Sequence, residues 1–336
     1  MTSTQKKHVQ YWLWSGIIMI SLMILIGGIT RLTDSGLSMS DWNLVMGSVP
    51  PLNDHEWQQT FERYKQFPQY QQLNAGMSLD EFKSIFFWEY LHRLIGRLIG
   101  IVFIIPFGYF WKKGYFNSDF LKRMFILMGL GALQGTMGWI MVKSGLVDIP
   151  YVSHYRLAMH FMLAFILIGF CLWYTLDLRK KTIQIFQESS LKRWLYIAGF
   201  LFIIQLIYGA FTAGLDAGYL YNTFPKMAGQ WIPPTFSALD PFLINLVENP
   251  GTVQWIHRVN GTLLLLAVIV FWWKAAVKQS NIWLRTMSST LLTIILLQYL
   301  VGVLTLIYSV PILLGIIHQG IAILFWIIFL SIVHRL

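Results

Sequence analysis

Four histidines lie inside long apolar segments of the chain, and their type and spacing are the first sign of chemistry: His92, His160, His257 and His318. Each stands about five to eight residues from one end of its segment, roughly 8–12 Å along a helix that rises 1.5 Å per residue. A single intramembrane histidine is more often a hydrogen-bonded packing residue. Four at one depth favour a site, because burying an ionisable group without a partner is costly.

Histidines paired across a four-helix bundle are the usual axial ligands of a heme iron. A zinc or copper site would need a third ligand close by, such as a cysteine or a carboxylate. The apolar segments of the second half of the chain offer none, and the single cysteine, Cys171, fits a small buried residue. The histidine pattern therefore indicates heme.

One carboxylate accompanies these histidines. Glu89 precedes His92 by three residues, so the two side chains share a helix face. In the second half of the chain the position of Glu89 is taken by Gln254, and an amide can orient a ligand but cannot take up a proton. Glu89 is therefore a candidate proton carrier or a stabiliser of a cationic intermediate. The alternative is a structural ion pair with Arg93 on the same helix.

Three arginines stand beside the histidines. Arg93 and Arg258 each directly follow a histidine, and Arg97 lies one turn beyond Arg93. Guanidinium groups bind carboxylates through paired, charge-assisted hydrogen bonds, so we expect these three to bind heme propionates. The alternative for Arg97 is that its side chain extends to the membrane surface.

Composition defines the elements that must position these residues. Of 336 residues, 56% are hydrophobic and only 12% are charged, whereas soluble domains carry about a quarter charged residues. A bilayer core needs roughly 20 apolar residues per helix. The sequence predicts an all-α polytopic membrane protein with eight spans, near residues 11–30, 87–111, 121–142, 153–175, 193–213, 252–273, 284–308 and 311–333.

The basic residues indicate how the spans are oriented. The formal net charge is +10, but the lysines and arginines gather at alternate loops, which is typical of the cytoplasmic side of a membrane protein rather than of nucleic-acid binding. We therefore expect both termini in the cytoplasm and the long loops, about 31–86 and 214–251, on the outer side. The N-terminal segment has no Arg-rich presequence, which favours a bacterial inner membrane over a mitochondrion.

The long first outer loop carries two helix signals. Ser78 to Glu81 resembles a capping box that begins a helix leading into the second span. Trp57, Phe61 and Tyr64 recur at helical spacing and favour an interfacial helix on the outer leaflet. A solvent-exposed helix is the alternative.

The sequence also repeats itself. IGGITRLTDSG (26–36) aligns with YGAFTAGLDAG (208–218), EYLHRLIG (89–96) aligns with QWIHRVNG (254–261), and SVPP (48–51) aligns with WIPP (231–234). We predict two four-helix bundles related as a parallel repeat. The predicted organisation is a tail (1–10), a first repeat (11–175), a linker (176–192) and a second repeat (193–336).

Beyond these patterns, EYLHRLIGR (89–97), AGLDAGYLYNTFPKMAGQWIPP (213–234) and the four placed histidines resemble the heme A synthase family. The resemblance covers about residues 11–333. The chain lacks the cysteine pairs of one branch and is similar to the cysteine-poor branch found in proteobacteria and mitochondria.

The resemblance implies an enzyme that oxidises a ring methyl of heme o to the formyl group of heme a for terminal oxidase assembly. It implies that His257 and His318 ligate a resident heme b, that His92 and His160 serve the substrate heme, and that Glu89 is catalytically important. Implied partners are a heme O synthase, oxidase assembly factors and an unidentified electron donor or acceptor.

Two other functions remain open at this point. A bis-histidine membrane cytochrome b would use the same histidines for electron transfer alone, but it would not need the difference between Glu89 and Gln254. A transporter with histidine proton relays is expected to place its polar residues near the midplane, whereas the histidines here lie near one face.

Overall fold

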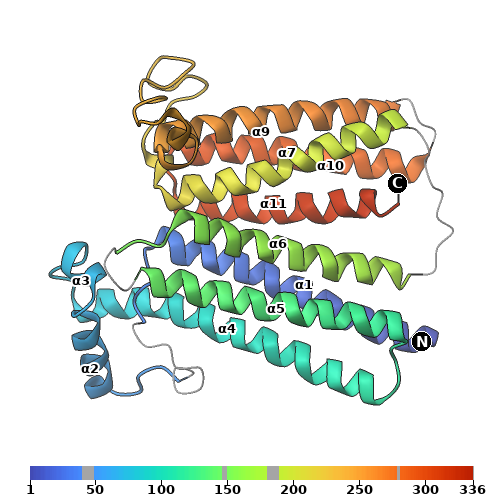
Figure 1. The fold of residues 1–336 in the computed structure, drawn as a ribbon, viewed down its shortest axis with the longest axis horizontal. Helices are drawn as coiled ribbons and strands as arrows, with labels where there is room; N and C mark the ends of the chain where they lie inside the picture. The colour runs from blue at the N-terminus through green and yellow to red at the C-terminus, as the bar shows by residue number, and fades with distance from the viewer. Residues whose placement is uncertain (40–48, 146–149, 180–188, 278–280, 336) are drawn as a thin grey trace. The chain divides into compact units, whose positions relative to one another are not determined.

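The computed structural model describes residues 1–39, 49–145, 150–179, 189–277 and 281–335. Within these ranges the regular elements are helices, and there is no strand. Eight helices there are long and apolar enough to cross a membrane. They are α1 (Ser3–Leu32), α4 (Leu79–Lys112), α5 (Ser118–Ser144), α6 (His154–Asp177), α7 (Ser189–Gly214), α9 (Pro250–Trp272) with the π-helical turn η4 (Trp273–Val277), α10 (Ile282–Ile307) and α11 (Ile312–Val333) (Figure 1).

Each of these helices coincides with one predicted span, so the eight-span, all-α prediction is confirmed and the chain is a multi-pass membrane protein. The remaining helices are short and lie in the loops before α4 and α9. They are α2 (Asp54–Tyr64), α3 (Pro68–Gln72), η2 (Ala217–Tyr219), η3 (Phe242–Ile244) and α8 (Asn245–Glu248).

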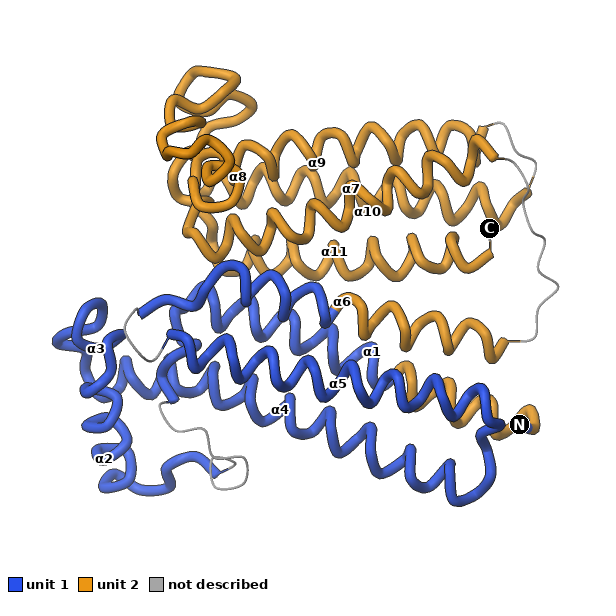
Figure 2. The backbone as a smooth tube through the Cα atoms, in the orientation of Figure 1, with its two compact units in different colours: residues 1, 15–164 blue, residues 2–14, 165–336 orange. Residues whose placement is uncertain are grey.

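The chain forms two compact units (Figure 2). Unit 1 comprises Met1 and residues 15–164, and unit 2 comprises residues 2–14 and 165–336. Helices α1 and α6 each contribute residues to both units. The repeat boundaries stay a prediction; Ser48 of the SVPP motif and residues 180–188 of the linker lie outside the described residues.

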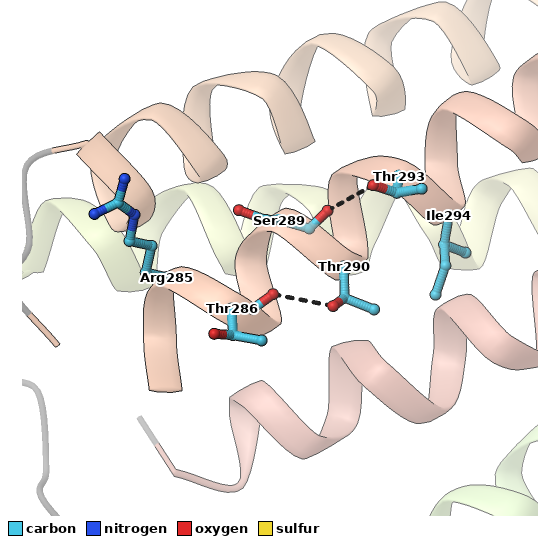
Figure 3. Close-up of a pocket in the computed structure, with 6 residues that line it drawn as sticks. All are labelled: Arg285, Thr286, Ser289, Thr290, Thr293 and Ile294. Atoms are coloured by element: carbon cyan, nitrogen blue, oxygen red, sulfur yellow. Dashed lines mark hydrogen bonds between the residues drawn. The ribbon is translucent and has the colours of Figure 1, made fainter. Parts of the chain in front are cut away.

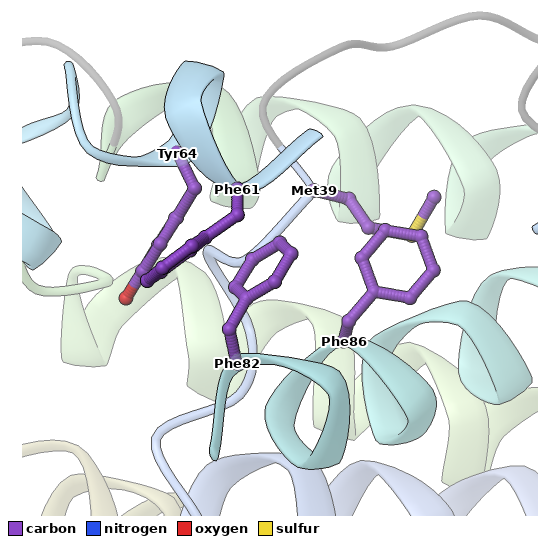
Figure 4. Close-up of a cluster of buried hydrophobic side chains, with 5 residues drawn as sticks. All are labelled: Met39, Phe61, Tyr64, Phe82 and Phe86. Carbon is purple, nitrogen blue, oxygen red and sulfur yellow. The ribbon is translucent and has the colours of Figure 1, made fainter. Parts of the chain in front are cut away.

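In unit 1 the loop before α4 folds onto the start of that helix. The predicted capping box is confirmed, because the Ser78 side chain accepts from the Glu81 amide while the Glu81 carboxylate accepts from the Ser78 amide. Just beyond it is a buried aromatic cluster, drawn in Figure 4: Met39, Phe61, Tyr64, Phe82 and Phe86.

Helix α2 is confirmed, but its apolar face does not serve the membrane surface. The rings of Phe61 and Tyr64 stack on Phe82 of α4 with centroids 5.1 and 5.0 Å away, and Trp57 packs edge-on against Phe86. The predicted insertion of these residues into the outer leaflet is therefore wrong, because α4 covers them.

Unit 2 is built on direct helix contacts. Helix α9 packs against α7 and α10, and α10 packs against α11. Its loop before α9 is held by amide side chains and by the ring of Phe236, which packs edge-on against Trp255 of α9. Asn245 bonds to the backbone of Leu239 and Phe242, and Asn249 bonds to Thr235 and caps the start of α9.

Candidate functional site

The structure brings the four histidines together as two pairs, one in each unit. His92 on α4 and His160 on α6 are close enough to interact electrostatically within unit 1. His257 on α9 and His318 on α11 do so within unit 2. All four side chains are partly buried. The sequence predicted one site per repeat, and each unit holds one such pair.

Each histidine ring lies against a glycine of a neighbouring helix. A Cβ built on Gly27 or Gly209 would stand 3.3 Å from the ring of His92 or His257. On Gly138 it would stand 3.0 Å from the His160 ring, and on Gly302 it would stand 2.8 Å from the His318 ring. Any larger residue at these four positions would push the imidazole away. The four glycines therefore permit each histidine ring to lie close to the backbone of the neighbouring helix.

Three glutamines, which the sequence reasoning missed, contact three of these rings. The amide nitrogens of Gln134, Gln205 and Gln298 lie 3.4, 3.2 and 3.2 Å from ring nitrogens of His160, His257 and His318 respectively. Gln134 and Gln205 also donate to the backbone carbonyl of the same histidine. The signal was present in the sequence: each glutamine stands four residues before the glycine under the ring.

Glu89 is 3% exposed and fully engaged in hydrogen bonds. One carboxylate oxygen accepts from the Ser38 hydroxyl at 2.7 Å and from the Met39 amide at 2.8 Å. The other accepts from Arg93 at 2.5 Å, and the same guanidinium nitrogen donates to the Met39 carbonyl at 2.9 Å. The ion pair that the sequence left as an alternative therefore forms, and it also ties α4 to the segment that follows α1.

Unit 2 contains the same arrangement without the charge. Gln254 donates to the Tyr221 carbonyl at 3.2 Å. Arg258 donates to Gln254, to the Tyr221 carbonyl and to the Thr223 carbonyl. In the repeat alignment Tyr221 is the counterpart of Met39. Both arginines therefore hold the backbone at equivalent positions, a role that sequence reasoning had not assigned to them.

Arg97 lies one turn beyond Arg93 and close enough to interact electrostatically with Arg93 and Tyr90. Arg93 and Arg258 lie near His92 and His257 and are bonded to backbone carbonyls. A separate groove runs along α10 and is lined by hydroxyl side chains that bond to their own helix (Figure 3). None of the candidate site residues lines it.

The histidine pairs fit a heme. Nδ1 of His160 and of His318 is buried without a hydrogen-bond partner, and so are the amide oxygens of Gln134 and Gln298. Buried polar atoms without a hydrogen-bond partner are costly in a protein core. A pair of imidazoles can ligate a heme iron, which would engage these ring nitrogens or their partners. Among the described residues there is no cluster of three or more His, Cys, Asp or Glu side chains that could hold a metal ion.

Comparison with known proteins shows the family of the chain. The family model described as cytochrome oxidase assembly protein (COX15-CtaA) matches residues 10–330. A protein of Flavobacterium psychrophilum named heme A synthase is 42% identical over 323 residues, which is 94% of each chain. The heme A synthase of Nitrosospira multiformis is 42% identical over 98% of this chain and 94% of its own. The heme A synthase of Parvibaculum lavamentivorans is 40% identical over 100% of this chain and 96% of its own.

Proposed function

The chain belongs to the COX15-CtaA family of cytochrome oxidase assembly proteins, and from this premise we propose that it is a heme A synthase. It oxidises a ring methyl of heme o to a formyl group and so produces heme a. Relatives with that name are about 40% identical over nearly the whole chain. The methyl group would lose four electrons to an external oxidant and gain one oxygen atom from water or dioxygen: two successive hydroxylations would give a gem-diol, which becomes the aldehyde on losing water.

The observation that carries the proposal is the position of Glu89. Its carboxylate is buried on the same helix face as His92, and its acceptor oxygens are oriented by Ser38, the Met39 amide and Arg93. Unit 2 keeps the arginine contacts, to the residue at this position and to the aligned backbone carbonyl, but has an amide in place of the carboxylate. A protein that only needed to hold two hemes would have no use for the difference, so unit 1 is the site of chemistry.

In unit 1, His92 and His160 bind the iron of the substrate heme, and Glu89 holds or moves a proton beside the reacting methyl. Arg93 holds the Glu89 carboxylate in position through their ion pair. Arg97, one turn away, is the propionate-binding residue of this unit.

In unit 2, His257 and His318 would hold the iron of a resident heme b, which would supply electron transfer. Gln254 and Arg258 fix the loop that follows α7, and Arg258 retains a buried Nε with no hydrogen-bond partner that is available to a propionate. These ligand assignments rest on the pairing of the histidines within each unit.

The setting follows from the same proposal. The chain resides in a bacterial cell membrane with both termini in the cytoplasm and both histidine pairs near the outer face. It receives heme o from a heme O synthase, delivers heme a to oxidase assembly, and exchanges electrons with a donor or acceptor that its sequence does not identify.

One experiment tests the function. The chain is expressed together with a source of heme o in cells that lack heme a, and extracted hemes are separated by chromatography and identified by mass spectrometry. We expect heme a, which carries a formyl oxygen in place of two methyl hydrogens. If the cells contain only hemes b and o, although the chain purified from them carries heme, the protein is instead a cytochrome that only carries electrons.

A further inference from the structure

The four histidines are not supported equally. Gln134, Gln205 and Gln298 each stand four residues before the glycine under a histidine ring, and each places its amide against that ring. The corresponding position before Gly27, the glycine under His92, is Met23. His92 is therefore the one histidine of the four without a glutamine at this position.

Met23 and Gln205 occupy the same place in their units. The Met23 methyl lies 3.6 Å from a Cβ built on Gly96, and the Gln205 amide nitrogen lies 3.1 Å from a Cβ built on Gly261. Gly96 and Gly261 each follow their histidine by four residues. The two side chains thus reach the same turn of the histidine-bearing helix, one with a thioether and one with an amide.

A second position changes together with the first. The amide oxygen of Gln205 accepts from Asn260 at 2.7 Å, and Asn260 also bonds to the Leu201 carbonyl of α7. In the repeat alignment the counterpart of Asn260 is Ile95. A polar pair in unit 2 has become the apolar pair Met23 and Ile95 in unit 1.

This difference bears on iron binding through the second ring nitrogen. A metal-bound histidine nearly always donates its other N–H to an acceptor, which fixes the ring and makes it a stronger ligand. In two of the pairs the required atoms are both present and unused: Nδ1 of His160 with Oε1 of Gln134, and Nδ1 of His318 with Oε1 of Gln298. Rotating the ring to join them would satisfy both atoms and turn Nε2 away from the amide. The Gln205 oxygen already accepts from Asn260, which fixes the amide, and its second lone pair would be the acceptor for His257. A methionine sulfur is only a weak acceptor.

We propose that Gln134, Gln205 and Gln298 are positioning residues for three strong iron ligands, and that Met23 leaves His92 as a weak, exchangeable one. Unit 2 then holds its heme by two supported histidines and retains it. Unit 1 holds its heme by one supported and one unsupported histidine. Resting on the proposed function, this asymmetry gives unit 1 a heme that can enter as substrate and leave as product.

The test transplants the unit 2 pair into unit 1. The double variant Met23→Gln with Ile95→Asn is compared with Met23→Leu with Ile95→Val, which keeps both positions apolar. Each purified full chain is loaded with heme o, and two quantities are measured: the low-spin fraction from the ferric absorption and electron paramagnetic resonance spectra, and the rate at which heme passes to excess apomyoglobin. Outer-shell partners typically change metal affinity by about 10- to 100-fold.

We expect the transplanted pair to raise the low-spin fraction and to slow transfer from unit 1 about tenfold or more, while the apolar control matches the parent chain. The reciprocal change, Gln205→Met with Asn260→Ile, should speed heme loss from unit 2, and it carries the test alone if the first variant does not fold. Unchanged spectra and transfer rates in a folded variant of either kind would overturn the proposal.

The result separates this inference from the proposed function. If the chain produces no heme a but the exchanged pairs alter spectra and transfer as described, the ligand asymmetry holds and the assigned reaction is wrong. If the chain produces heme a and the exchanged pairs change neither quantity, the reaction stands and the asymmetry of support is wrong.

Discussion

The two units hold the start of their histidine-bearing helix in the same way but with different charge. In unit 1, Glu89 and Arg93 form a buried ion pair whose members both bond to the backbone of Met39. In unit 2, Gln254 and Arg258 bond to each other and to the Tyr221 carbonyl. In both units, therefore, an arginine at the same position of the helix bonds to the backbone carbonyl at the same position of the preceding loop. Only unit 1 has a carboxylate beside it.

The comparison separates structure from chemistry at this position. In unit 2 the helix is hydrogen-bonded to the preceding loop through an amide and an arginine. The negative charge of Glu89 is therefore not needed to hold the helix and the loop together. A buried charge costs desolvation energy that even a close partner does not always return. The carboxylate is therefore best explained by a step that needs proton transfer or charge, which only unit 1 would perform.

The largest effect is expected from replacing a histidine that is proposed to bind iron. Replacing His257 by Ala would remove one of the two proposed iron ligands of unit 2, and we expect the absorption bands of the proposed resident heme to disappear from the purified chain. Replacing the exposed His8 in the N-terminal turn of α1 by Ala is the matched control and should leave the bands unchanged. A full heme spectrum in His257→Ala would show that the pair is not the ligand set.

A smaller loss is expected when the two units are made alike. Glu89→Gln gives unit 1 the amide of unit 2, so Arg93 keeps its bond to the Met39 carbonyl and the fold is maintained. Because positioned acids and bases contribute about 10²- to 10⁴-fold to rates, heme a formation should fall by about two orders of magnitude. The reciprocal Gln254→Glu should leave it nearly unchanged.

Both outcomes are read by quantifying extracted hemes against the bound heme spectrum of the same preparation. Normal heme a from Glu89→Gln would remove the catalytic role, and the ion pair would then be a structural feature of unit 1 alone.

Replacing a glycine under a histidine ring should have an effect that depends on how closely that ring approaches the glycine, even within one unit. An Ala Cβ at Gly302 would meet His318 at 2.8 Å, whereas at Gly209 it would meet His257 at 3.3 Å. We expect Gly302→Ala to shift the heme spectrum and to destabilise unit 2 by about 1–3 kcal/mol, as overpacking does, and Gly209→Ala to have a smaller effect. Gly108→Ala, where nothing lies within 4 Å of the new Cβ, is the control. Equal thermal melting and spectra for all three would contradict the contact.

The smallest effect concerns the buried cluster that supports the loop before α4 in unit 1. The Tyr64 hydroxyl donates to Gln69 and accepts from Asn74, and Gln69 in turn donates to the Asp34 carbonyl. Tyr64→Phe should lower the free energy of unfolding by about 1 kcal/mol, seen as a lower melting temperature. The exposed Tyr308→Phe should not.

The same tyrosine makes the stability depend on pH. Burial raises the pKa of Tyr64 to about 12, whereas an unfolded tyrosine has a pKa of about 10. The folded state therefore holds this proton more tightly, and the stabilisation is complete below pH 10 and lost as the pH rises towards 12. Alkaline melting curves of Tyr64→Phe should lack this part of the decline; a decline identical to that of the parent chain would contradict it.

Much of the fold was predictable from single residues and periodicity. Eight apolar segments gave the eight helices, and the Ser78 to Glu81 pattern gave the cap of α4. The alignment of EYLHRLIG with QWIHRVNG pointed to Glu89 and Gln254 as the informative difference, and both prove to be buried at equivalent contacts.

What the sequence did not yield depended on contacts between distant segments. The roles of Ser38 and Met39 arise only when the loop after α1 returns to α4, and neither residue type suggests a carboxylate partner. Glutamines in apolar helices carry no charge, so Gln134, Gln205 and Gln298 attracted no attention until they were found beside the histidine rings. Helix α2 was misassigned to lipid because an aromatic face is equally suited to a membrane or to other rings.

The length of α4 has a consequence for how the site is positioned. At 34 residues and 1.5 Å per residue the helix is about 51 Å long, well beyond the roughly 30 Å of a hydrocarbon core. The predicted span 87–111 leaves the first two turns of α4 beyond that core, and these turns carry Phe82 and Phe86 of the buried cluster. One continuous helix therefore provides the surface on which α2 folds and, one to two turns further along, the positions of Glu89 and His92.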